Sequence, residues 1–354
     1  MRRRLTATYA VLCTLLFVAG FVAVFYFAWQ RGIDEGISAL VSFAVSLFLA
    51  PFVHELGHAI FAGGANMQIL YCKFFCFKFF RKNGKLKLGF ASPFAPDQTQ
   101  AIPKTGGNMQ RRASAYTLGG LVFSGVFLAL ILTPAIWLAC IGHFKGNLFG
   151  YVPYMGYLFL LNILPVEYAS GKTDALVFKG IRKGFDAEKV MLSAMEIQGQ
   201  LYAGKSFSEV EEGLYFDLPQ LCEDEPLFAV ILDLRYRYFL EKEEYDRAAD
   251  CLNRLAQAQV YLTDSEVEKI AAELTYMHAL RGDLDGAEAS GKLCRAFLAE
   301  NTVAAKRVLI AYSKLAGKTE AIEPLLQQAK ACLQWEIAGV AKAESILLSR
   351  IEKD

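Results

Sequence analysis

Residues 37–62 read ISALVSFAVSLFLAPFVHELGHAIFA, a nearly continuous apolar run that contains His54, Glu55 and His58. At a rise of about 1.5 Å per residue, a helix of this length spans a hydrocarbon core of about 30 Å. An ionisable residue deep in such a helix costs about 3 kcal/mol, so three of them within five positions require a compensating partner. The stretch therefore predicts a membrane-spanning helix that carries a polar site.

Three further apolar runs, residues 5–29, 115–141 and 148–165, predict a protein with about four spans. The first run is too long for a cleaved signal peptide and ends in a poor cleavage site. The loop 64–114 holds nine Lys or Arg residues against one acid, Asp97. The positive-inside rule then predicts that the N-terminus, this loop and the C-terminal part of the chain are cytoplasmic.

The composition divides the chain into two chemically different parts. Apolar residues make up 54% of the sequence, more than an ordinary soluble domain needs, and they dominate up to about residue 180. We predict a mainly α-helical chain with a transmembrane domain over 1–182 and a soluble α-helical domain over 183–354. The formal charge of +1 gives no reason to expect a nucleic-acid partner, and the eight scattered cysteines favour reduced thiols.

His54, Glu55 and His58 match the pattern H-E-x-x-H. On a helix this spacing sets both imidazoles on one face, about one turn apart, so that both can reach one Zn²⁺. Glu55 is rotated by about 100° from the first histidine, which suits it to take a proton from the attacking water rather than to bind the metal. A chance match is the alternative, and the cost of three ionisable residues in a membrane helix argues against it.

A catalytic zinc site usually has three protein ligands and one open position, so the third ligand must come from elsewhere in the chain. His143 lies in a connection predicted on the opposite side of the membrane, and His278 falls in the C-terminal part. Asp174 follows the fourth apolar run on the cytoplasmic side, the side toward which the two histidines lie. Glu167 is the local competitor.

These motifs resemble the site-2 protease family of intramembrane zinc metalloproteases. That family pairs H-E-x-x-H in one span with an N-x-x-P element and a later D-G, which here correspond to Asn162–Pro165 and Asp174, over roughly residues 35–180. The gap between them is longer than the commonest family spacing, and Ala175 stands where the family usually has Gly. Gly119–Ser124 is similar to a G-P-x-x-N stretch of the family, although small residues there also suit close helix packing.

The resemblance implies the roles of the site residues. His54, His58 and Asp174 are expected to bind Zn²⁺. Glu55 is expected to be the general base, and Asn162 to position the substrate or its oxyanion. For Asn162, a hydrogen bond within a helix that is broken before Pro165 is an equally good interpretation.

The function implied is an intramembrane metalloendopeptidase of the bacterial inner membrane that cuts a membrane-protein substrate within or near the bilayer. A substrate helix must unwind before its amides can be attacked. The Asn83-Gly84 pair between extended, aromatic-rich flanks predicts a β-hairpin over about 69–94, whose free edge could pair with an unwound substrate. Cys72 and Cys76 lie among phenylalanines, which favours apolar packing over a second zinc site.

The C-terminal part contains a loose internal repeat. Residues 240–248, 280–287 and 315–322 each end one helix and open the next. The spacing of about 35–40 residues resembles tetratricopeptide-type helical hairpins, whose repeat is about 34 residues, and a generic helical bundle is the alternative. We expect this domain to bind a cytoplasmic protein partner, to restrain access or to recruit substrate.

Two other functions compete with the leading one. In a membrane-anchored scaffold the metal site would be structural, but such a site needs four protein ligands and no acid beside the first. In a zinc protease of the prenyl-protein-processing type the third ligand would be a downstream Glu. The Asn162–Pro165 element argues against that type.

Overall fold

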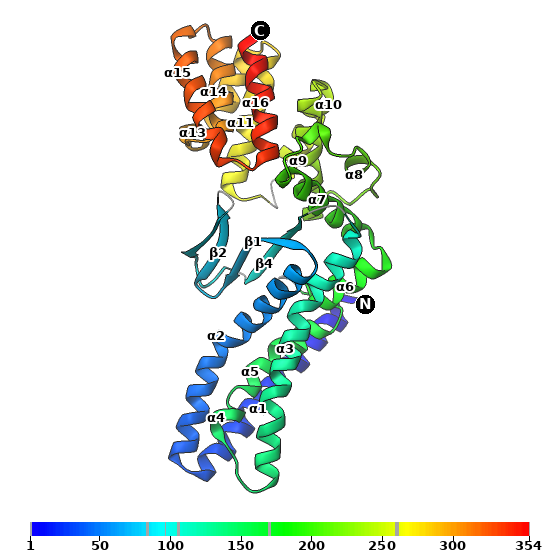
Figure 1. Cartoon of the computed structure of the whole chain (residues 1–354), viewed down its shortest axis with the longest axis vertical. Helices are drawn as coiled ribbons and strands as arrows, with labels where there is room; N and C mark the ends of the chain where they lie inside the picture. Colours follow the sequence, from blue (N-terminus) through cyan, green and yellow to red (C-terminus); the bar gives the residue numbers. More distant parts are fainter. Residues whose placement is uncertain are drawn as a thin grey trace. The chain divides into compact units, whose positions relative to one another are not determined.

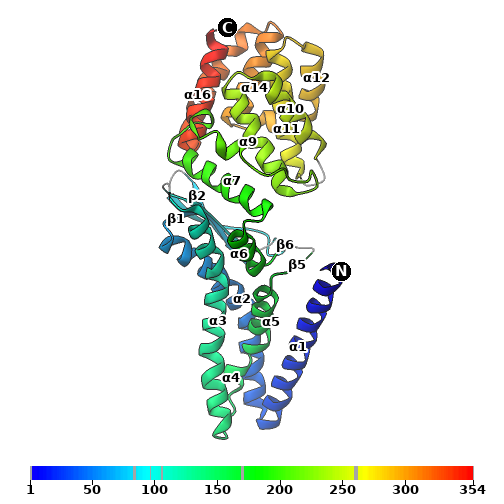
Figure 2. The same ribbon diagram turned by 90° about the vertical axis from the view of Figure 1, so that its right-hand side faces the viewer.

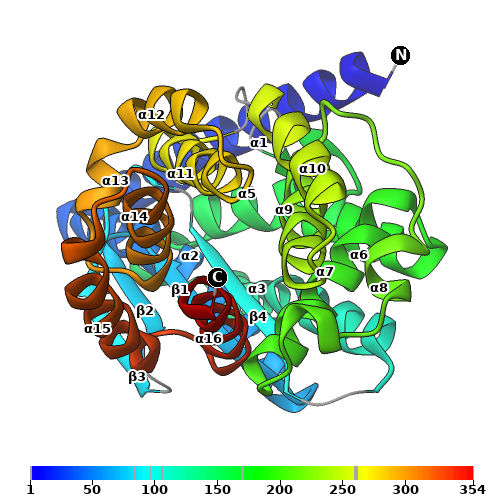
Figure 3. The same ribbon diagram turned by 90° about the horizontal axis from the view of Figure 1, so that it is seen from above.

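The computed structural model describes residues 2–82, 85–95, 97–104, 107–168, 171–258 and 262–353 (Figures 1, 2 and 3). The chain divides into two compact units, residues 1–188 and 189–354. The observed division falls inside α7 (Asp186–Tyr202), and the boundary expected after residue 182 falls at the end of α6 (Asp174–Lys183).

Long apolar helices dominate the first unit. Within the described residues, three helices are long and apolar enough to cross a membrane: α1 (Arg2–Arg31), α2 (Ile33–Gly64) and α3 (Met109–Cys140). Large apolar side chains on these helices face outward, such as Leu15 on α1 and Leu130 on α3, which are 61% and 66% exposed. Surfaces of this kind suit lipid rather than water, in agreement with the expected membrane association.

The fourth apolar run differs from the prediction. It is divided between two short helices, α4 (Gly146–Phe149) and α5 (Val152–Ile163), and Pro153 lies in the first turn of α5. With 12 residues, α5 extends for about 18 Å, which is shorter than a hydrocarbon core of about 30 Å. The described residues thus contain no fourth full-length span. Figure 2 shows α5 beside α1, to which the Tyr9 hydroxyl links it by donating to the Leu160 carbonyl.

An antiparallel sheet follows α2, and its strand order in the described residues is β3-β2-β1-β4. The strands are β1 (Met67–Phe74), β2 (Phe77–Lys82), β3 (Lys85–Phe90) and β4 (Gln98–Pro103). The expected small β region is confirmed, with β2 and β3 paired as a hairpin, while its Asn83-Gly84 turn lies outside the described residues. Strand β4, which the sequence does not predict, pairs with β1 and contacts α2 (Figure 1).

The segment between α5 and α6 brings Asp174 to the start of a helix. Strands β5 (Glu167–Tyr168) and β6 (Gly171–Lys172) pair with each other. Thr173 then caps α6, because its side chain accepts a hydrogen bond from the Leu176 amide and donates one to the Leu164 carbonyl at 2.8 Å. This buried threonine ties the loop to the helix and fixes Asp174 in the first turn.

The second unit consists of helices. Its α-helices after α7 are α8 (Gly213–Phe216), α9 (Pro226–Glu241), α10 (Tyr245–Gln257), α11 (Asp264–Leu280), α12 (Leu284–Leu293), α13 (Arg295–Ala299), α14 (Val303–Leu315), α15 (Ile322–Cys332) and α16 (Ala338–Lys353). Short 3₁₀ helices cover Phe207–Glu209, Thr319–Ala321 and Leu333–Trp335. Figure 3 shows α9 beside α10, α11 beside α12 and α14 beside α15, so that each expected turn joins two neighbouring helices.

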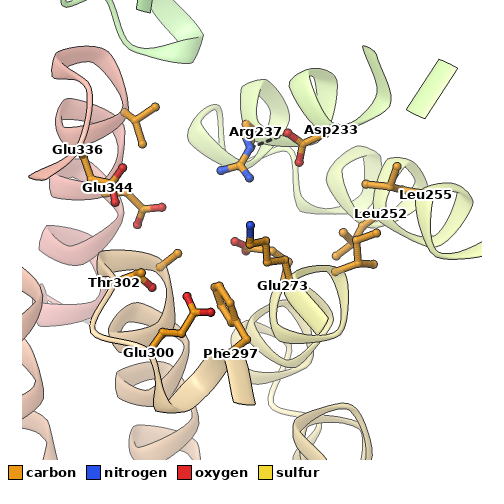
Figure 4. A pocket seen from close by; sticks show the side chains of 14 residues that line it. Asp233, Arg237, Leu252, Leu255, Glu273, Phe297, Glu300, Thr302, Glu336 and Glu344 are labelled. Carbon is orange, nitrogen blue, oxygen red and sulfur yellow. Dashed lines mark hydrogen bonds and ion pairs between the residues drawn. The ribbon is translucent and has the colours of Figure 1, made fainter. Parts of the chain in front are cut away.

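A buried ion network joins four helices of this unit. Arg307 of α14 is 1% exposed and donates to Glu273 of α11 at 2.7 Å and to Glu344 of α16 at 2.8 Å. The Tyr236 hydroxyl of α9 also donates to Glu273. A cavity of about 290 Å³ opens beside the two acids, and Figure 4 shows Arg237 and Asp233 paired on another side of it.

Candidate metal centre

His54 and His58 lie one helical turn apart on the C-terminal half of α2, and Asp174 meets them from the start of α6. The two histidine Nε2 atoms are 3.3 Å apart. The Asp174 Oδ2 atom lies 3.0 Å from the Nε2 of His54 and 3.3 Å from that of His58. Among the described residues, these three side chains form a group with the composition and spacing to hold a metal ion.

The outer nitrogens of both imidazoles have partners on α3. The Nδ1 of His58 is 2.9 Å from the Tyr116 carbonyl oxygen, and the Nδ1 of His54 is 3.1 Å from the Ser124 Oγ. A carbonyl oxygen only accepts, so the Nδ1 of His58 must carry the proton. In the neutral imidazole the Nε2 lone pair is then directed at the Asp174 carboxylate, the arrangement in which a histidine binds a metal.

These distances test whether a metal fits. Tetrahedral ligands at about 2.0–2.1 Å from Zn²⁺ lie about 3.3 Å from one another, close to the three separations observed here. The Asp174 Oδ2 atom is buried and forms no hydrogen bond of normal geometry. With the proton on Nδ1, the Nε2 lone pair of His58 and the Asp174 carboxylate face each other at 3.3 Å, and the repulsion between them is relieved only by a proton or a cation between the two atoms. A single proton could bridge only one of these three pairs of atoms, whereas one cation can bind all three atoms at once.

Close packing of α2 against α3 brings the histidines to this position. A Cβ at Gly57 would lie 2.3 Å from the Gly119 carbonyl oxygen, and one at Gly119 would lie 2.4 Å from that of Gly57. Gly120 faces the site, because a Cβ there would lie 2.4 Å from the Nε2 of His58. The small residues noted in the sequence therefore allow the two backbones to approach closely.

Glu55 lies in the same cavity as the three candidate ligands. Its side chain is buried, and its Oε2 accepts a hydrogen bond of 2.6 Å from the Thr99 hydroxyl of β4. The cavity has a volume of about 610 Å³, within the range of small-ligand sites. It is lined by Pro51, His54, Glu55, His58, Asp97, Gln98, Thr99, Tyr116, Thr117, Tyr154, Leu158, Asn162, Lys172, Asp174 and Val177.

The other residues considered from the sequence fall in different places. Asn162 lines the cavity, and its side-chain nitrogen donates to the Leu158 carbonyl one turn earlier at 3.2 Å. Glu167 is exposed on β5 and does not belong to the ligand group.

The remaining candidates lie elsewhere in the chain. His143 lies in the α3–α4 connection, and His278 pairs with Asp283 in the second unit. Burial raises the pKa of the Cys72 thiol, and Cys72 does not belong to the ligand group.

Sequence reasoning missed the residues that support the site. Thr99, Tyr116 and Ser124 hold the site side chains through hydrogen bonds. Ser124 falls in the stretch similar to the family pattern, but Thr99 and Tyr116 belong to no recognisable motif. Their role depends on contacts between positions far apart in the chain, which no local pattern reports. Searches of protein-family models, curated proteins and solved structures found no match to this chain.

Proposed function

We propose that this chain is a zinc-dependent membrane endopeptidase of the site-2 protease type, which cuts a membrane-protein substrate within or near the bilayer. The observation that carries the proposal is the meeting of His54, His58 and Asp174 at 3.0–3.3 Å. Glu55 lines the same cavity, so a general base is available beside the ligands. Three protein ligands and an open cavity favour a catalytic site over the closed, four-ligand site of a scaffold.

Bound Zn²⁺ supplies Lewis-acid activation of water and of the scissile carbonyl. Glu55 takes a proton from the attacking water and returns it to the leaving amine. Asn162, which lines the same cavity, holds the substrate backbone or its oxyanion. The charged Asp174 and the two histidines keep the metal side of the cavity polar, while Leu158 and Val177 contribute apolar surface.

The sheet offers a place for an extended substrate. The edge next to the cavity is β4 rather than the 69–94 hairpin, because Gln98 and Thr99 line the cavity and β3 forms the other edge. An unwound substrate segment pairs along this strand, which aligns a peptide bond with the site. If charged substitutions along β4 left cleavage unchanged, this part of the proposal would be wrong.

The protein acts in the bacterial inner membrane with both termini in the cytoplasm, and α5 returns the chain toward the cytoplasmic side. The second unit binds a cytoplasmic protein partner, restrains access to the site or recruits substrate. Its helical hairpins and its cavity of about 290 Å³ between α9, α11 and α16 support a binding role.

The first test measures zinc per chain in detergent-purified protein, which needs no substrate. We expect about one zinc in the wild type and in Glu55→Gln, and loss of zinc in His54→Ala and Asp174→Asn. Glu167→Gln is the matched control for Asp174→Asn and should keep its zinc. Zinc retained by Asp174→Asn and lost from Glu167→Gln would reassign the third ligand.

The second test measures proteolysis of dye-labelled casein, which is unstructured and requires no unwinding. We expect wild-type protein to cut it and Glu55→Gln to be inactive while it keeps its zinc. Full activity in Glu55→Gln would contradict the mechanism. A wild type that holds no zinc under metal-replete conditions would favour the scaffold function instead.

A further inference from the structure

Thr99 of β4 makes a direct contact with the proposed general base. Its side chain is 7% exposed, and its hydroxyl lies 2.6 Å from the Oε2 of Glu55. An ionised carboxylate only accepts hydrogen bonds, so the Thr99 hydroxyl is the hydrogen-bond donor and Glu55 is the acceptor. The Glu55 carbonyl oxygen and the Cys72 Sγ both lie farther from this hydroxyl, at 3.4 Å. The carboxylate is therefore its main acceptor.

The backbone of Thr99 is held from the other side by α3. The Tyr116 hydroxyl donates a hydrogen bond to the Thr99 carbonyl. The Tyr116 carbonyl in turn accepts from the Nδ1 of His58 at 2.9 Å. Separate hydrogen bonds thus join Glu55 to Thr99, Thr99 to Tyr116, and Tyr116 to His58.

This arrangement restricts where Glu55 can act. A glutamate has three side-chain torsions, and a catalytic group must be held within about 0.5 Å of its productive position. Thr99 occupies one carboxylate oxygen, which leaves the other oxygen to face the reacting water. Thr99 also belongs to β4, the strand at the cavity edge. Its hydrogen bond therefore connects this strand directly to Glu55.

We propose that Thr99 is a positioning residue for Glu55, and that β4 aligns the base with a substrate segment paired along that strand. This inference rests on the proposed function. The Thr99 hydroxyl acts through Glu55, by keeping that side chain in the orientation that proton transfer requires.

The test uses the full-length, zinc-loaded protein and compares Thr99→Val, which keeps the shape but removes the hydroxyl, with Thr99→Ser, which keeps the hydroxyl. For casein cleavage, we expect Thr99→Val to lower kcat by about 10–100-fold with KM within about twofold, and Thr99→Ser to retain most of the activity. Thr275→Val is the matched control, since Thr275 is a buried threonine of α11 whose hydroxyl donates to a backbone carbonyl.

A second readout does not depend on turnover. Acetohydroxamate binds zinc and donates its hydroxyl proton to a neighbouring carboxylate, so its affinity reports the position of Glu55. We expect about tenfold weaker binding to Thr99→Val, near wild-type binding to Thr99→Ser, and unchanged zinc content in both.

The outcomes separate this inference from the function on which it rests. If zinc-loaded wild type cuts casein and Thr99→Val matches it in kcat and in acetohydroxamate affinity, the positioning role is wrong and the function stands. If Thr99→Ser is as impaired as Thr99→Val, the hydroxyl is not the relevant group and the inference also fails. A wild type without zinc overturns the proposed function and this inference together.

Discussion

At Gly120 the α3 backbone passes against both histidine side chains. A Cβ at this position would lie 2.4 Å from the Nε2 of His58 and 2.7 Å from the Cε1 of His54. The contact involves the ring atoms that converge on Asp174, and those rings are also held through their Nδ1 atoms. Neither ring can move aside without the loss of a hydrogen bond, so the site depends on the absence of a side chain at residue 120.

We predict that Gly120→Ala weakens zinc binding by about 10–100-fold, because the new methyl group displaces the histidines from their shared position. The measurement is zinc affinity in a competition assay with a colorimetric chelator. Gly156→Ala in α5 is the control, since a Cβ there meets no atom within 4 Å. Equal affinities in the two variants would show that the histidines tolerate the methyl group.

At the scale of elements, the three helical hairpins of the second unit share one turn geometry. The second residue after the first helix of each hairpin has a left-handed backbone: Glu243 with φ of 63°, Gly282 with φ of 74° and Gly317 with φ of 70°. These residues follow α9, α11 and α14. Left-handed conformations are costly for residues with a Cβ, which explains glycine in two of the three turns.

We predict that Gly282→Ala destabilises the second unit by about 1 kcal/mol through backbone strain alone, because a Cβ at this position meets no neighbour within 4 Å. Gly291→Ala is the matched control inside α12, where a Cβ makes only ordinary contacts, the nearest at 3.8 Å. That change should stabilise the unit by about 0.5–1 kcal/mol. Urea unfolding of the full-length protein in detergent measures both. If Gly282→Ala stabilised the unit instead, the prediction of backbone strain at residue 282 would be wrong.

At the scale of the molecule, the candidate metal centre constrains how the chain can cross a membrane. If α1, α2 and α3 were the only segments that cross the membrane, the residues after α3 would lie on one side of it and the C-terminal end of α2 on the other. Asp174 nevertheless meets His54 and His58 near that end of α2. The segment with α4 and α5 must therefore carry the chain back, although α5 has only 12 residues.

We predict that the α3–α4 connection faces outward and the second unit faces the cytoplasm. Cys140 at the end of α3 and Cys222 in the second unit are both exposed, so single-cysteine variants that keep one of them report the two sides. A membrane-impermeant maleimide should label Cys140 in intact spheroplasts and Cys222 only after permeabilisation. Labelling of Cys222 in intact spheroplasts would reverse the assigned orientation.

Local patterns were sufficient for much of the fold and part of the site. Hydropathy over about 20 residues predicted the three long apolar helices, because burial in lipid is a property of each segment taken alone. The H-E-x-x-H spacing placed His54 and His58 on one helical face, since helix geometry relates neighbours one turn apart. The turns of the second unit were also visible, as helix ends depend on nearby residues.

Tertiary structure decided the features that depend on distant contacts. It brought Asp174, rather than Glu167, to the two histidines across about 120 residues of chain, through the Thr173 cap and the packing of α6 on α3. It added β4 and the contact between Thr99 and Glu55, and it divided the fourth apolar run into α4 and α5. Such contacts arise from packing between segments, and the free energy of that packing is not contained in the periodicity of any one of them.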